Sequence, residues 1–148
     1  MSVEVDAPPE RVWAIAADPR QLPRWERHIV SIEDVPPGGL ARGASYTVVM
    51  RFVAVHTKVH AEVLEWSPPG YACVRLSGVL DATVRTTITP VGRRRSRLEH
   101  DVEYTFRGGA LGELAARSLQ LLGGAQLALK LGTLAQKHQI ESGSRRPR

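Results

Sequence analysis

His100 and Tyr104 are the residues whose types and spacing best suit acid-base chemistry in this sequence. They lie four positions apart in a segment of alternating polarity, so in a β-strand both side chains share one face with Leu98 and Val102. An unperturbed imidazole titrates at about pH 6.5 and can act as a general acid or base. A phenol two pleats away can donate a hydrogen bond to a carbonyl oxygen. The pair therefore predicts enolisation of a bound ketone.

The alternative interpretation of His100 is structural, because a lone histidine among apolar neighbours is commonly a core residue with hydrogen bonds to the backbone. Three other kinds of candidate have plainer explanations. His56 and His60 alternate with valines and are expected to face solvent, so we expect no metal site there. No base marks Cys73 as a nucleophile, and we expect its thiol to be buried. Arg75 is expected to form a surface ion pair.

The composition of the chain is that of one folded domain. Of its 148 residues, 43% are hydrophobic and 24% are charged, which suffices for a core and argues against disorder. The single cysteine excludes an internal disulfide, and no early apolar stretch suits a signal peptide, so we expect a cytoplasmic protein. The most apolar region, 110–135, contains charged side chains and predicts a soluble helix instead of a membrane span.

The positive charge of the chain has a local origin. The net charge is +5, but without the three arginines of the last four residues it is +2, and without the four arginines of segment 93–97 as well it is −2. A nucleic-acid surface needs a basic face spread over folded elements, with aromatic side chains for stacking. Aromatic residues make up only 5% of this chain, so we expect no nucleic-acid partner.

The sequence begins with a strand pattern followed by two short helices. Residues 2–6 alternate polar and apolar side chains up to Pro8 and Pro9, which suit the first turn of a helix. Asp18-Pro19 ends this helix, and a second short helix or turn carries Leu22 and Trp25.

From residue 29 to residue 106 the hydrophobic pattern has a period of two, which predicts six strands at 29–35, 44–53, 56–66, 71–76, 80–89 and 97–106. The separators are short and rich in Pro and Gly, so neighbouring strands are antiparallel and no crossover helix fits between them. For segment 71–76 two alternatives stay open. The inward side chains are either Tyr71, Cys73 and Arg75 or Ala72, Val74 and Leu76.

The remainder of the chain predicts one long helix over 110–139, which must lie on the sheet. One stripe of this helix carries leucines, and a second stripe of small side chains leaves space. Gly123-Gly124 indicates either a bend that makes room for a ligand or a break between two packed helices. We expect residues 142–148 to form a disordered basic tail, so that the folded domain comprises residues 1–141.

This order of elements resembles the helix-grip arrangement, and several motifs carry the likeness. They are Val3 to Trp13, Asp18-Pro19, Leu22-Pro23, Trp25, Glu62 to Pro69, Thr87 to Pro90 and Gly108 to Gly112. In these motifs the chain resembles START-like (SRPBCC) proteins of the polyketide cyclase/dehydrase and lipid transport superfamily, from Val3 to about Glu141.

The resemblance implies an α+β fold in which a curved antiparallel sheet of about seven strands grips a long C-terminal helix. It also implies a deep apolar cavity for a polyketide, lipid, quinone or similar ligand, and no cofactor. Aromatase/cyclases of this superfamily usually carry an arginine inside the cavity on the fourth strand. This sequence has Ala61, Glu62, Val63 and Leu64 there, which puts that mechanism in doubt.

The expected ligand-binding side chains are those on the inward phase of the strands, on the second short helix and on the long helix. They are Trp25, Tyr46, Val48, Met50, Phe52, Val59, Ala61, Val63, Val84, Thr86, Leu121 and Ala125. With His100 and Tyr104 as catalytic residues, they predict a cofactor-independent, polyketide cyclase-like enzyme. The alternative is a non-catalytic carrier of a lipid or quinone, or a self-resistance protein that sequesters its ligand. A homodimer through an exposed sheet edge has no dedicated sequence signal.

Overall fold

The computed structural model describes residues 1–106 and 133–142, and every structural statement below concerns these residues. Seven strands form one antiparallel sheet in the order β1-β7-β6-β5-β4-β3-β2. Their bounds are β1 (Ser2–Val5), β2 (Ile29–Glu33), β3 (Ser45–Phe52), β4 (Val55–Ser67), β5 (Tyr71–Ser77), β6 (Leu80–Gly92) and β7 (Arg95–Phe106). The predicted sheet is confirmed, and the largest difference is that β6 and β7 extend to a two-residue turn at Arg93 and Arg94.

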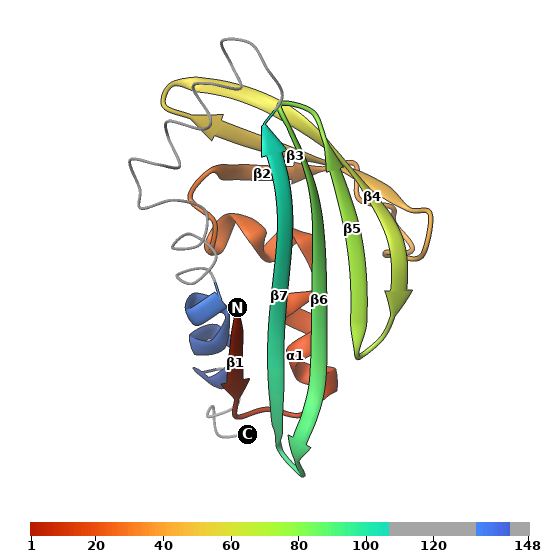
Figure 1. Ribbon diagram of the computed structural model, residues 1–148, viewed down its shortest axis with the longest axis vertical. Helices are drawn as coiled ribbons and strands as arrows, with labels where there is room; N and C mark the ends of the chain where they lie inside the picture. Colours follow the sequence, from red (N-terminus) through yellow and green to blue (C-terminus); the bar gives the residue numbers. More distant parts are fainter. Residues whose placement is uncertain (107–132, 143–148) are drawn as a thin grey trace.

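The sheet bends strongly around the helical elements (Figure 1). Helix α1 (Pro9–Ala16) begins at the two prolines, and the 3-10 helix η1 (Pro19–Arg24) follows it. The Asp18 carboxylate caps η1 by accepting a hydrogen bond of 3.0 Å from the Arg20 backbone N–H, which satisfies a donor that the first turn leaves unpaired. The predicted order of strand, two short helices and meander is therefore confirmed.

The described part of the C-terminal helix comprises residues 133–142, so it includes Ser142, three residues beyond the predicted end of the helix. It lies beside β1 in Figure 1. Glu141 accepts a hydrogen bond from the Asp6 backbone N–H at 3.0 Å and ties the helix to the end of β1. The predicted helical segment 110–132, with Leu121, Ala125 and Gly123-Gly124, and the tail after Ser142 lie outside the described residues. None of the described helices is long and apolar enough to cross a membrane.

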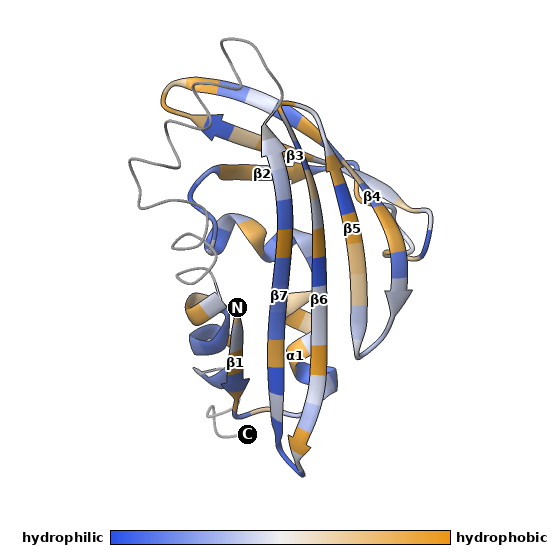
Figure 2. Cartoon of the chain, viewed as in Figure 1, coloured by the Kyte–Doolittle hydropathy of each residue, from blue (hydrophilic) through white to orange (hydrophobic). Residues whose placement is uncertain are grey.

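The buried apolar side chains form two groups on the concave side of the sheet. The first core cluster joins β3, β4 and β6 through Tyr46, Val48, Met50, Phe52, Val59, Ala61, Val63 and Ala82. The second core cluster joins β1, α1, β6, β7 and the C-terminal helix through Val5, Ala7, Val12, Ile88, Leu98 and Ile140. Figure 2 shows the alternation of apolar and polar residues along β6 and β7 that places one set inside and the other in solvent.

A β-bulge in β4 decides which side chains of β4 and β5 point inward. Val63 pairs with Val74, but Glu65 pairs with Cys73, so Leu64 is an extra residue in β4. An extra residue reverses the phase of a strand, and Trp66 therefore joins Val63 on the concave face. Of the two alternatives for β5, the structure selects Ala72, Val74 and Leu76 as the inward set.

Candidate functional site

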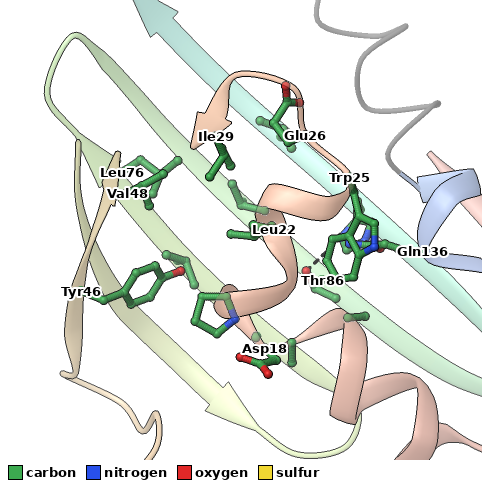
Figure 3. A pocket seen from close by; sticks show the side chains of 18 of the residues that line it. Asp18, Leu22, Trp25, Glu26, Ile29, Tyr46, Val48, Leu76, Thr86 and Gln136 are labelled. Atoms are coloured by element: carbon green, nitrogen blue, oxygen red, sulfur yellow. Dashed lines mark hydrogen bonds between the residues drawn. The ribbon is translucent and has the colours of Figure 1, made fainter. Parts of the chain in front are cut away.

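A pocket of about 230 Å³ lies between the concave face of the sheet, η1 and the C-terminal helix (Figure 3). Two rows of paired residues across the sheet form much of its wall. One row is Trp66, Ala72, Thr86 and His100, and the other contains Val74, Val84 and Val102. Leu22 and Trp25, from η1 and the residue after it, face these rows. The wall is predominantly apolar, which is the usual character of a small-molecule site.

The structure places the predicted ligand-binding residues in two different environments. Trp25, Tyr46, Val48, Met50, Val84 and Thr86 line the pocket, as does His100. Phe52, Val59, Ala61 and Val63 are fully buried in the first core cluster and do not line it. Their inward direction follows from the strand period, but at that part of the sheet the side chains of β2 to β4 fill the space between themselves. These four residues support the wall from behind.

Tyr104 does not share the pocket with His100. It lies on the same face of β7, opposite Ala82, but its side chain is 44% exposed and is not part of the pocket wall. Four residues of strand separate the two Cα atoms by about 13 Å. The alternation that placed both residues on one face is correct, whereas the structure brings only His100 to the pocket.

His100 is held by hydrogen bonds at both ring nitrogens. Its Nδ1 lies 3.0 Å from Oγ1 of Thr86 on β6, and its Nε2 lies 2.6 Å from Oε1 of Gln136 on the C-terminal helix. An amide oxygen only accepts, so Nε2–H donates to Gln136 and Nδ1 accepts the Thr86 hydroxyl proton. This chain of bonds links two strands to the helix and fixes one tautomer of a neutral imidazole.

Burial lowers the pKa of His100 below its ordinary value of 6.5, and the hydrogen bond to Gln136 opposes this only in part. An unfolded chain binds the proton at about pH 6.5, whereas the folded chain does not until lower pH. We therefore expect the free energy of unfolding to be highest above pH 6.5 and to fall as the pH drops toward the folded-state pKa. Urea denaturation at several pH values between 7.5 and 5 measures this slope.

In the His100→Asn variant the decline in unfolding free energy over this pH range is expected to be shallower, because the titrating group is gone. The depressed pKa of Asp18 acts only at more acidic pH, where a carboxylate with lowered pKa loses its stabilising charge. An equal slope in the wild type and the variant would contradict the assignment to His100.

The polar face of the C-terminal helix was not predicted. Gln136 contacts His100, and Gln139 one turn later accepts a hydrogen bond of 2.8 Å from Nε1–H of Trp25 and donates one of 3.2 Å to Gln21. Thr133 and Gln136 also line the pocket. The signal was present in the sequence, because three polar residues recur at intervals of three in a mostly apolar helix and share one face.

Tyr46 presents a hydroxyl group to the pocket. Its ring reaches from β3 into the pocket in Figure 3, the side chain is only 6% exposed, and burial raises its pKa to about 12. Within the described residues the hydroxyl has no hydrogen-bond partner. Every fully buried side-chain nitrogen and oxygen in this part of the chain has a partner, so the Tyr46 hydroxyl must be accessible from the pocket.

The charged residues of the pocket wall are acidic. Asp18 and Glu26 line it, and no lysine or arginine does so within residues 1–106 and 133–142. Burial raises the pKa of Asp18, but hydrogen bonds from Arg20 outweigh this effect and leave its pKa below the ordinary value. Glu26 accepts a hydrogen bond of 2.8 Å from Nδ1 of the buried His28, a contact that the sequence pattern did not reveal. The wall is thus unsuited to a buried anion.

The remaining candidate residues lie away from the pocket. Arg75 forms an ion pair with Glu62 at 2.9 Å, and the thiol of Cys73 is buried; both were expected. His56 and His60 are exposed. No group of three His, Cys, Asp or Glu side chains in the described ranges is arranged to hold a metal ion.

Comparison with solved structures gives the same architecture. A conserved protein from Geobacillus kaustophilus superposes with a TM-score of 0.70 at 20% identity, over 94% of this chain and 91% of that one. The Zhui aromatase/cyclase from a Streptomyces species superposes with a TM-score of 0.70 at 13% identity, over 99% and 92%. A START superfamily protein from Mycobacterium smegmatis gives 0.60 at 18% identity, over 90% and 96%. At such identities the likeness establishes the helix-grip fold alone.

The family is established by sequence. No protein in the curated set matches this chain. The family model for polyketide cyclase/dehydrase and lipid transport proteins, in contrast, matches residues 1–137. That range includes the whole sheet, both short helices and most of the described C-terminal helix. The chain therefore belongs to the polyketide cyclase/dehydrase and lipid transport family.

Proposed function

We propose that this protein binds a bulky hydrophobic small molecule in the pocket between the sheet and the C-terminal helix. The observation that carries the proposal is the volume of about 230 Å³ inside a wall built mainly of valine, leucine, alanine and tryptophan side chains. A well-packed interior of this size rarely leaves so large a space empty, because each unfilled volume costs stability. Membership of a family named for polyketide cyclisation and lipid transport supports the same conclusion.

Native mass spectrometry of the protein purified from its source, followed by solvent extraction, tests this proposal. We expect a mass above that of the chain alone and one extractable hydrophobic compound. Protein stripped of that compound should take it up again at one molecule per chain. A bare chain that also fails to bind any hydrophobic probe would contradict the proposal.

A second candidate function is cyclisation or dehydration of the bound molecule, and the geometry of Thr86 and His100 favours it. The Thr86 hydroxyl lies on the pocket wall with the lone pair of His100 Nδ1 behind it at 3.0 Å. A proton that a ligand gives to Thr86 Oγ1 can pass to Nδ1 as Thr86 releases its own. The Zhui and BexL structures, which are described as aromatase/cyclases, share the fold.

Incubation with a polyketone substrate, followed by extraction, separates the two functions. Product that forms with the wild type but not with His100→Ala supports catalysis. Recovery of unchanged substrate leaves binding as the sole function. In this experiment Tyr104→Phe is expected to retain the wild-type rate, since its hydroxyl lies outside the pocket wall.

A further inference from the structure

We infer that Tyr46 selects neutral ligands that carry a hydrogen-bond acceptor, such as a ketone or quinone carbonyl, and that the pocket rejects carboxylates. This inference rests on the proposed binding function and defines its ligand class. Two observations support it independently: the unpartnered Tyr46 hydroxyl and the signs of the charges on the wall.

The Tyr46 hydroxyl is the donor that the pocket offers to a ligand. A side chain only 6% exposed has little access to bulk water, and a buried hydroxyl without a partner costs free energy. The other polar groups near the pocket are already engaged: Trp25 Nε1–H donates to Gln139, and the Thr86 hydroxyl donates to His100. A ligand carbonyl placed against Tyr46 supplies the missing acceptor.

The wall charges explain why the acceptor must be neutral. A carboxylate in an apolar pocket needs a cation or several donors to replace its hydration shell. The described wall contains no lysine or arginine, and its charged groups, Asp18 and Glu26, have the sign that repels an anion. A fatty-acid carboxylate is therefore a poor ligand, whereas a ketone of the same shape needs only the phenol.

Three probes of nearly equal shape test this inference: methyl naphthyl ketone, isopropenylnaphthalene and naphthoate, each substituted at the same ring carbon. Affinities are measured by fluorescence titration at pH 7.5 for the wild type, Tyr46→Phe and the control variant Tyr71→Phe. Tyr71 lies on the outer phase of β5, and its side chain does not line the pocket. Thermal unfolding of each variant verifies that the fold is retained.

We expect the ketone and the alkene to bind the wild type and naphthoate to bind at least about 100-fold more weakly than the ketone. Tyr46→Phe should weaken ketone binding about fivefold, the usual worth of one neutral hydrogen bond, and should leave alkene binding within twofold. Tyr71→Phe should change neither affinity.

Ketone affinity that is unchanged in Tyr46→Phe, or naphthoate binding as tight as ketone binding, would overturn the inference while the proposed binding function stands. If none of the three probes binds the wild type, the proposed function fails, and the inference fails with it. The two failures are therefore distinguishable.

Discussion

Val84→Trp is expected to abolish ligand binding while the protein stays folded. Val84 is half-buried and lies at the centre of the wall row, between Val74 and Val102. An indole at this position projects into the space of about 230 Å³ and fills a large part of it. We expect the affinity for methyl naphthyl ketone to fall by about 100-fold or more, because a pocket that has lost its volume no longer buries the ligand.

The stability of Val84→Trp separates a filled pocket from a damaged core. Overpacking a dense core costs about 1 to 3 kcal/mol, whereas filling an empty space costs less or stabilises the protein. The midpoint of thermal unfolding should therefore stay within a few degrees of the wild-type value. Val30→Trp is the matched control, because Val30 is 44% exposed on β2 and does not line the pocket. Undiminished ketone binding by Val84→Trp would show that the ligand lies elsewhere.

Leu98→Ala is expected to cause the largest loss of stability among single truncations near the site. Leu98 is fully buried in the second core cluster, where it packs with Val5, Val12, Ile88 and Ile140. These neighbours belong to β1, α1, β6 and the C-terminal helix, so a cavity at Leu98 loosens every element that closes this end of the sheet. Leucine-to-alanine changes in cores cost about 2 to 5 kcal/mol, and we expect a loss of about 3 kcal/mol in the free energy of unfolding.

Urea denaturation of Leu98→Ala and Leu134→Ala measures this effect with a matched control. Leu134 lies in the C-terminal helix and is 41% exposed, so its truncation removes the same atoms without opening a buried cavity. We expect Leu134→Ala to change the free energy of unfolding by less than about 1 kcal/mol. Equal losses in the two variants would contradict the role assigned to the second core cluster.

Strand number and direction were predictable because period-two patterns and Pro/Gly separators act locally. The alternation along β3, for example, correctly placed Tyr46, Val48 and Met50 inside. The bulge at Leu64 was not predictable, since an extra residue in a strand depends on pairing with a neighbour. Without it, the choice of inward side chains on β5 stayed open until the structure decided it.

The site was predictable in part, for a related physical reason. The pattern identifies which face of a strand a side chain occupies, and His100 was correctly placed on the inner face. It does not tell how far along that face the pocket extends, so Tyr104 and Val59 were included although neither lines the wall. Nor does it reveal partners distant in sequence. The bond from His100 to Gln136 spans 36 residues and settles the tautomer of the ring.

The proposed binding inside the sheet is tested most directly by nuclear Overhauser contacts between methyl naphthyl ketone and the methyl groups of the protein. We predict contacts from the naphthalene protons to the methyls of Val48, Leu76 and Val84, which line the pocket, and none to Val30 or Val55, which are exposed. Saturable binding with contacts confined to exposed methyls such as those of Val30 and Val55 would contradict an internal ligand site.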